Sequence, residues 1–232
     1  REMDERIVKN MLSGHPLRND AGADNGVRVF DINGDGFMDV LIANEKAKVS
    51  RVWEPKSREW RDVPFPVTLS HDLRFGVLDE SGNAVAVTPK TGWRFTGKAW
   101  AEDKTLAAGQ GGFRLLDINN DGVCELISNS SIKSRSEGSW KMLSFRFPEG
   151  NEIETKDGND AGMRFADIND DGNLDVIFSN GKRYGTWTFE SMEKGWARRG
   201  LYGERENSGV GENHPRGRDA LAPIVRADGT NN

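Results

Sequence analysis

The sequence predicts an all-β fold made of repeated four-stranded units, which is the pattern of a β-propeller. The first observation is a nine-residue acidic loop that occurs three times, beginning at Asp31, Asp117 and Asp167, with a shortened relative at Asp79. The second is that these units start 48, 38 and 50 residues apart, with short apolar or tryptophan-bearing stretches between them. A period of about 40–50 residues with four strands per unit is typical of propeller blades.

Each full loop has oxygen-bearing side chains at positions 1, 3, 5 and 9 and a glycine at position 6. Such a loop surrounds a hard cation with carboxylate, amide and carbonyl oxygens, and the glycine provides the positive φ of the sharp turn. We therefore expect about three Ca²⁺ ions with a structural role. The expected ligands, in which the seventh residue contributes its backbone carbonyl, are Asp31, Asn33, Asp35, Phe37 and Asp39; Asp117, Asn119, Asp121, Val123 and Glu125; and Asp167, Asn169, Asp171, Asn173 and Asp175.

The flanks of these loops are expected to be strands. In the first unit, Val27–Phe30 leads into the loop and the apolar run 40–43 leaves it, so the loop closes a hairpin. A helix–loop–helix calcium site needs an acidic residue at position 12 and helical flanks. This chain has Ile42, Ser128 and Phe178 at that position, so strand flanks are predicted.

The predicted blades begin near residues 26, 74, 112 and 162, with an incomplete blade near 223, so we expect four to five blades that belong to a larger ring. The turn of the second unit, at Asp79, is too short and too poor in acids to bind a cation. Residues 1–25 are expected to form a lead-in segment, in which 4–12 suits a short helix or an edge strand. Tryptophan-bearing strands are predicted at 51–53, 59–61, 92–95, 98–100, 140–142, 186–189 and 195–197. Their tryptophans are expected to pack between blades rather than to stack on sugars.

Composition excludes several classes of function. The net charge is −5, but the three loops hold nine carboxylates at ligand positions. Three bound divalent cations would change the net charge from −5 to +1, so the sequence gives no reason to expect a nucleic-acid-binding surface. The single cysteine, Cys124, precludes a disulfide within the chain, and no apolar run approaches the roughly 18 residues of a membrane span.

Some residues outside the loops are candidates for ligand binding. Arg28, Arg114 and Arg164 each stand three residues before the first acid of a loop. They would form a basic ring for an anionic ligand or, as we favour, ion pairs or hydrogen bonds to neighbouring blades and loops. In the long connection 203–215, Glu212 and His214 would be an acid–base pair, although a turn histidine is the favoured interpretation.

The repeats resemble the FG-GAP/VCBS calcium-binding repeats of integrin α-subunit heads and of many bacterial surface and secreted proteins. The resemblance covers about residues 20–232 and rests on the glycine before the inner strand (Gly26, Gly112, Gly162), on the acidic loop and on the aliphatic strand after it. It implies a calcium-binding β-propeller. Glu125 in place of aspartate and the missing site near Asp79 depart from the pattern.

The tail 224–232 is similar to a stretch of planctomycete-type membrane-bound dehydrogenases, which join propellers to c-type haem modules. No haem motif or cofactor fingerprint occurs in this chain.

These observations favour a non-catalytic, extracytoplasmic binding or scaffold module that recognises carbohydrate or protein, as part of a longer protein with other domains. The alternative is the propeller portion of a periplasmic sugar-type dehydrogenase whose catalytic or haem module lies outside this chain. Whether the longer protein is an enzyme is left open by the sequence.

Overall fold

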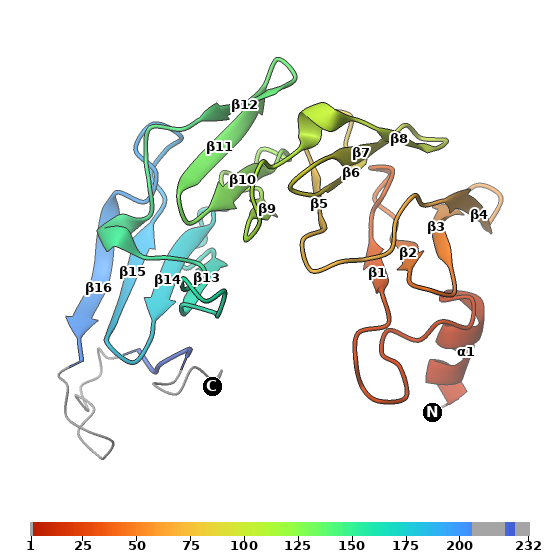
Figure 1. The fold of residues 1–232 in the computed structure, drawn as a ribbon, viewed down its shortest axis with the longest axis horizontal. Coiled ribbons are helices and arrows are strands. Elements are labelled where there is room, and N and C mark those ends of the chain that lie inside the picture. Colours follow the sequence, from red (N-terminus) through yellow and green to blue (C-terminus); the bar gives the residue numbers. More distant parts are fainter. Residues whose placement is uncertain (1, 206–220, 226–232) are drawn as a thin grey trace. The chain divides into compact units, whose positions relative to one another are not determined.

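The computed structural model describes residues 2–205 and 221–225. The chain divides into two compact units, Arg1–Gly111 and Gly112–Asn232. Each unit contains two antiparallel four-stranded sheets, and within every sheet the strands lie side by side in chain order (Figure 1). The predicted four-stranded units are therefore confirmed, and the described fold is built almost wholly of β-sheet.

The first unit starts with a helix and continues with two sheets. Its elements are α1 (Glu2–Asn10); the first sheet, β1 (Val27–Phe30), β2 (Asp39–Ala43), β3 (Lys48–Glu54) and β4 (Glu59–Pro64); and the second sheet, β5 (Arg74–Val77), β6 (Ala84–Val87), β7 (Gly92–Phe95) and β8 (Trp100–Glu102). A short 3₁₀ helix, Lys104–Leu106, follows β8. The turn of the second sheet, between β5 and β6, corresponds to the shortened loop at Asp79.

The second unit repeats this arrangement. Its sheets are β9 (Arg114–Leu116), β10 (Glu125–Ser128), β11 (Ser131–Ser136) and β12 (Ser139–Met142), and then β13 (Met163–Ala166), β14 (Asp175–Ser179), β15 (Arg183–Thr188) and β16 (Arg198–Glu204). A 3₁₀ helix, Pro148–Gly150, lies between the two sheets in the chain.

The strand predicted at 195–197 is wrong, because β16 begins at Arg198. Trp196 instead leaves the strand path and is buried, with its Nε1–H donating to the Leu174 carbonyl at 2.7 Å. Its ring stacks on Phe147 and meets Phe145 edge-on. In the first unit, Trp100 packs against Phe65 and donates to Ser50 Oγ. Trp196 is therefore a core residue, and Trp100 is partly buried against the core between the first and second sheets.

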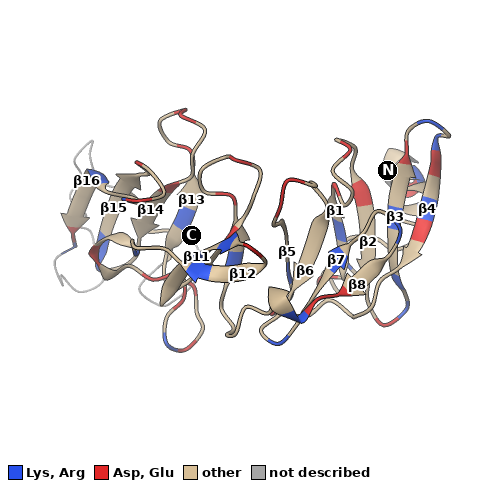
Figure 2. Cartoon of the chain, turned by 90° about the horizontal axis from the view of Figure 1, so that it is seen from above, with Lys and Arg blue, Asp and Glu red and all other residues tan. Residues whose placement is uncertain are grey.

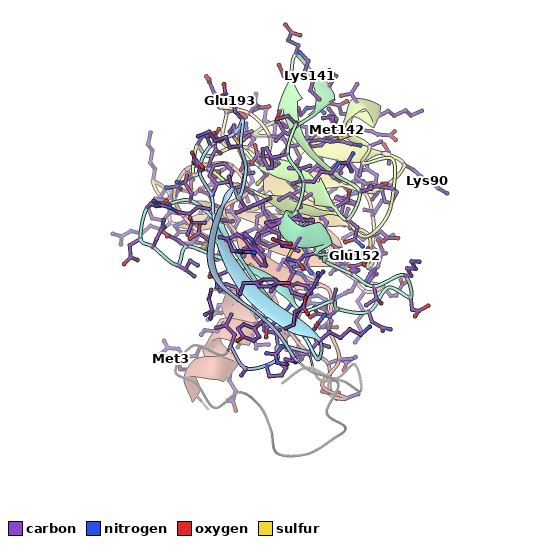
Figure 3. All side chains as sticks on the ribbon, turned by 90° about the vertical axis from the view of Figure 1, so that its left-hand side faces the viewer. Met3, Lys90, Lys141, Met142, Glu152 and Glu193 are labelled. Carbon is purple, nitrogen blue, oxygen red and sulfur yellow. The ribbon has the colours of Figure 1, made fainter. Side chains whose placement is uncertain are left out.

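Helix α1 packs against one face of the first sheet. β2 is buried along its whole length, and its residues alternate between the two faces. Val40 and Ile42 join Leu12 and Val8 in a cluster beneath the helix, whereas Leu41 and Ala43 face the second sheet. Residues 4–12 were predicted to form either a short helix or an edge strand, and the structure shows the helix α1. The opposite side of α1 exposes Met3 to solvent (Figure 3).

The second residue of the first and second acidic loops connects one sheet with the next sheet of the same unit. Ile32 is fully buried between the first and second sheets, and its carbonyl accepts the Ala84 N–H at 2.8 Å. In the second unit Ile118 is equally buried, and its carbonyl accepts the Leu174 N–H at 2.9 Å. Ile168, in the last loop, is 43% exposed. The same residue type therefore has a packing role only where another sheet lies against the loop.

This difference predicts unequal effects of one substitution. Ile32→Ala and Ile118→Ala should each lower the free energy of unfolding by about 3 kcal/mol, because each removes buried methyl groups between two sheets. Ile168→Ala should change it by less than about 0.5 kcal/mol. Urea denaturation of the three variants measures this, and equal losses at all three positions would show that the burial difference does not matter.

Candidate metal-binding loops

The three acidic loops share two internal hydrogen bonds, in which positions 1 and 5 accept the N–H groups of positions 6 and 7. Asp31 accepts the N–H groups of Gly34 and Gly36, each at 2.8 Å, and Asp35 accepts the Phe37 N–H at 2.9 Å. Asp117 and Asp121, and Asp167 and Asp171, repeat the bonds to the sixth and seventh residues at 2.8–2.9 Å. Positions 1 and 5 are thus held at the inside of each loop. Figure 2 shows acidic residues in several connections between strands.

The backbone conformation of the loops follows from two positions. Gly36, Gly122 and Gly172 have φ of 84–87°, as predicted for position 6. Position 4 also has a positive φ, in Gly34, Asn120 and Asp170. Glycine, asparagine and aspartate are the residues that adopt this region most readily. The residue types at position 4 are therefore a sequence signal for the turn, and the prediction from position 6 alone left it out.

In the first and third loops, the ninth residue joins two segments of backbone, because its carboxylate accepts an N–H group from each. Asp39 is fully buried; its Oδ2 accepts the Ile32 N–H at 2.9 Å and its Oδ1 accepts the Trp53 N–H of β3 at 2.7 Å. Asp175 makes the equivalent bonds to Ile168 and Phe189 at 3.1 and 2.7 Å. From the sequence, these side chains were expected only to bind metal. In the structure, Asp39 joins its loop to β3, and Asp175 joins its loop to Phe189, the residue directly after β15.

Negative charge accumulates in the loops. Burial raises the pKa of Asp39, the Trp53 and Ile32 N–H groups lower it, and the nearby Asp35 and Asp31 raise it further. In the second loop, burial raises the pKa of Glu125 to about 7, and Asp121 and Asp117 add to the increase. Ionised carboxylates therefore repel one another in these loops, and a bound cation would remove this cost.

One atom of the second loop tests whether the residues fit a cation. Asn119 Oδ1 is buried and has no hydrogen-bond partner, although buried polar atoms normally have one. Its amide nitrogen donates to Asp121 Oδ2 at 2.9 Å, so the oxygen is the unsatisfied end. Carboxylate, amide and carbonyl oxygens are the ligands of hard cations such as Ca²⁺. The donors at positions 1, 3, 5 and 7 fit such an ion.

The acids alone do not make a cluster. Among residues 2–205 and 221–225, no group of three or more Asp, Glu, His and Cys side chains is arranged to hold a metal. The expected metal ligands include an asparagine and a backbone carbonyl in addition to the acids. In the first and third loops, the acid at position 9 also accepts hydrogen bonds from two backbone N–H groups.

The second sheet uses a side-chain cation at the corresponding turn. Arg94 of β7 forms an ion pair with Asp79 and donates a hydrogen bond to its Oδ2. Although burial raises the pKa of Asp79, hydrogen bonds from Ser81 and the charge of Arg94 lower it overall. No metal was predicted at this turn, and the guanidinium group supplies a positive charge there.

Two of the three recurrent arginines, Arg28 and Arg164, pair with an acid of their own repeat. Arg28 forms a two-pronged ion pair with Asp24, at 2.9 and 2.6 Å, which lowers the pKa of Asp24 to about 2. Arg164 pairs with Asp160 in the same way, at 3.0 and 2.7 Å. The charge of Arg114 also contributes to the lowered pKa of Asp160. The pattern D-x-G-x-R at 24–28 and 160–164 is a sequence signal for this pair that went unrecognised in the prediction.

Two further predictions fall at the C-terminal part of the chain. Glu212 and His214 lie outside the described residues. At the incomplete repeat near 223, the Ile224 N–H donates to the Ser179 carbonyl at 3.0 Å, and in the first unit the Leu69 N–H donates to the Ala43 carbonyl at 2.7 Å. Ile224 therefore contacts the end of β14 as Leu69 contacts the end of β2. Residues 226–232 lie outside the described range.

Comparisons with known proteins give little further guidance. No protein-family model matches the chain, and no curated protein matches it. Among solved structures, a chain of the Photorhabdus luminescens Tc holotoxin pore is similar, with 20% sequence identity and a TM-score of 0.48 over 83% of this chain. The match covers 10% of that toxin chain. In the described part of the protein, no helix is long and apolar enough to cross a membrane.

The double hydrogen bond of the ninth residue predicts a metal-independent effect. Asp39→Asn keeps the size of the side chain but replaces one acceptor with an NH₂ group that faces a backbone N–H. The free energy of unfolding should fall by about 2 kcal/mol in the presence of EDTA. Asp175→Asn provides the matched change in the third loop. Chemical denaturation measures both, and stabilities equal to the parent in EDTA would contradict the fastening role.

The raised pKa of Glu125 predicts a dependence of stability on pH. The folded chain holds this proton more tightly than the unfolded chain, because the pKa rises from 4.5 to about 7. The resulting stabilisation is complete below about pH 4.5 and is lost as the pH rises through about 7. In EDTA the parent should lose roughly 1–3 kcal/mol across this window relative to Glu125→Gln. Parallel pH profiles of the two proteins would contradict this assignment.

Proposed function

We propose that the four sheets are blades of a β-propeller, that each of the three acidic loops holds one Ca²⁺, and that the protein is a non-catalytic, extracytoplasmic module that binds carbohydrate or protein. The observation that carries this proposal is the repeated hairpin loop with an oxygen-only donor set and shared internal geometry. Sheets of four strands that repeat along a chain with this period suit a propeller.

The donor chemistry favours calcium over other metals. The loops offer carboxylate, amide and carbonyl oxygens and no histidine or thiol donor at the expected ligand positions, whereas zinc sites use nitrogen and sulfur. Each loop has acids at positions 1 and 5 and a further acid at position 9. This number of acids suggests a dissociation constant for Ca²⁺ on the order of 10⁻⁵–10⁻³ M. Such sites fill in calcium-rich surroundings outside the cytoplasm, which supports an extracytoplasmic location.

Different residues of the loop would bind the ion and hold the loop in place, as expected for a structural ion. Asp31, Asn33 and Asp35 would hold the cation, while Asp39 fixes the loop to β3. The bound ion would supply positive charge that offsets the repulsion among the carboxylates. Because the acids also close the hairpin by hydrogen bonds to its backbone, their arrangement is accounted for by stabilisation of the fold, and this supports a binding or scaffold role.

Calcium should stabilise the protein, and the effect should divide among the loops. At a calcium concentration about 100 times the dissociation constant, each filled site adds about 2.7 kcal/mol to the free energy of unfolding of its unit. The melting temperature should therefore rise by several degrees between EDTA and excess calcium. Asp35→Ala should reduce this rise and lower the number of bound ions from three to two, measured by differential scanning calorimetry and equilibrium dialysis.

Asp20→Ala is the control for that measurement, because Asp20 is an exposed acid outside the loops. This variant should keep the full response to calcium. A melting curve that is the same in EDTA and in excess calcium would refute the structural metal.

A further inference from the structure

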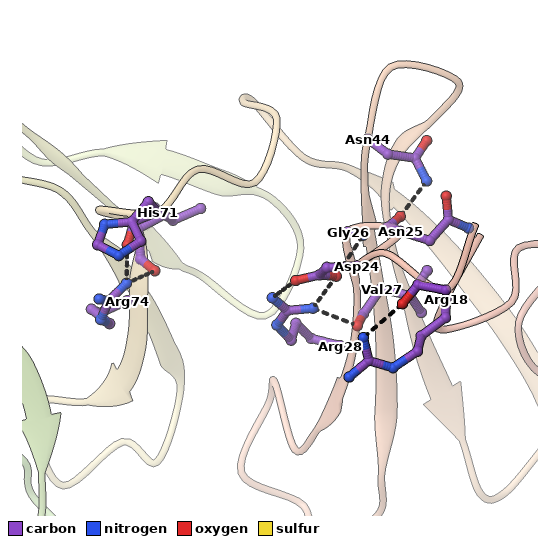
Figure 4. Close-up of polar contacts among 11 residues, drawn as sticks. Arg18, Asp24, Asn25, Gly26, Val27, Arg28, Asn44, His71 and Arg74 are labelled. Carbon is purple, nitrogen blue, oxygen red and sulfur yellow. Dashed lines mark hydrogen bonds and ion pairs between the residues drawn. The ribbon is translucent and has the colours of Figure 1, made fainter. Parts of the chain in front are cut away.

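The first unit contains a groove of about 950 Å³ beside its inner strands. One wall consists of the end of the lead-in loop and β1, including Asp24 and Arg28. The facing wall is the connection into β5, including His71 and Arg74, and the β2–β3 turn contributes Lys46. Figure 4 shows the polar groups of the two walls. Ligand sites commonly have volumes of about 300–1,000 Å³.

The polar groups on the first wall are held in fixed positions. Arg28 is clamped by Asp24 and by its bond to the Val27 carbonyl at 2.9 Å (Figure 4). Both side chains of this pair remain accessible, at 39% and 54% exposure. Asp24 is itself fixed by the Gly26 N–H at 2.9 Å. The wall therefore presents adjacent donor and acceptor groups that need little rearrangement to bind a ligand.

The second wall supplies a positioned positive charge. Arg74 donates to the carbonyls of His71 and Leu73, so its guanidinium group is anchored to the backbone (Figure 4). The His71 side chain is 82% exposed. Phe30 and Phe75, whose ring centroids are 5.1 Å apart, supply apolar lining.

The charges of the groove indicate the class of ligand. Among the side chains that line the groove, Arg28, Lys46 and Arg74 give three positive charges, and Asp24 and Glu45 give two negative charges, so the lining has one positive charge in excess. Asp72 does not line the groove, and its carboxylate lies 3.6 Å from His71 Nδ1. A fixed carboxylate beside a guanidinium group matches neighbouring hydroxyl groups, each of which donates and accepts. The excess charge matches one carboxylate, and the phenyl rings match the apolar face of a sugar ring.

We propose that this groove binds a carbohydrate that carries a carboxylate group, with its hydroxyl groups on the Asp24–Arg28 pair and its carboxylate on Arg74. This inference rests on the proposed binding function and specifies the ligand class and the site. The carboxylate would receive charge-assisted hydrogen bonds from the guanidinium group, which lysine reproduces only in part.

The test uses the full chain in excess calcium on an array of oligosaccharides that contain uronic or sialic acid, each printed beside its carboxyl-reduced form. Binding is then measured by calorimetry with the strongest acidic binder. We expect the reduced form to bind at least about tenfold more weakly. Arg74→Ala should weaken binding to a similar degree, and Arg74→Lys should have an intermediate effect.

Arg58→Ala is the matched control, because Arg58 is an exposed arginine of the β3–β4 turn and does not line the groove. It should bind like the parent. Circular dichroism and the calcium-dependent melting temperature of every variant, measured on the same samples, report separately on folding and on the calcium sites.

Three results would overturn the inference. They are equal binding of the acidic and reduced sugars, binding by Arg74→Ala equal to that of the parent, and no binding to any acidic sugar. If neutral sugars bind independently of Arg74 while calcium still raises the melting temperature, the proposed function stands and the groove assignment fails. If calcium has no effect on melting but the groove binds acidic sugars through Arg74, the calcium part of the proposed function fails alone.

Discussion

A buried carboxylate that accepts two backbone N–H groups is the interaction on which the acidic loops depend. Asp39 and Asp175 each join the start of a loop to the third strand of the sheet or to the residue directly after it, so opening the hairpin breaks two hydrogen bonds to a carboxylate. Placing a buried acid there brings it close to the acids at positions 1 and 5. The geometry that closes the hairpin thus concentrates negative charge, which a bound cation would relieve.

Two kinds of group can supply the positive charge that an acidic turn needs, namely an arginine side chain and a metal ion. In the second sheet, the turn at Asp79 is short, and a guanidinium group from the neighbouring strand β7 supplies the positive charge. In the other three sheets, the longer loops carry acids at positions 1, 5 and 9, and in the second loop Asn119 Oδ1 is left without a partner. A side chain brings its charge permanently, whereas a metal ion brings it according to its concentration, so the proposed calcium sites would make stability depend on the surroundings.

The sequence predicted the features that repeat and missed those that depend on a partner elsewhere in the chain. Four-stranded units, strand flanks and the positive φ at position 6 follow from periodicity and local backbone preference. The second role of Asp39 could not be predicted, because its acceptor bond to Trp53 spans 14 residues. Trp196 lies beside a strand rather than in it because its indole fills an aromatic core built from other segments of the second unit. The Asp24–Arg28 pair was readable as a local pattern but was not recognised.

Helix α1 has a consequence for the behaviour of the chain in solution. Val40 and Ile42 lie on the face of β2 that the helix covers, together with Val27 and Val49. Without residues 2–12, this face would be a flat, bare strip of β-branched side chains, the kind of surface on which sheets from separate molecules adhere. A nine-residue helix that covers this strip therefore reduces the apolar surface on which aggregation could begin, in addition to its contribution to packing.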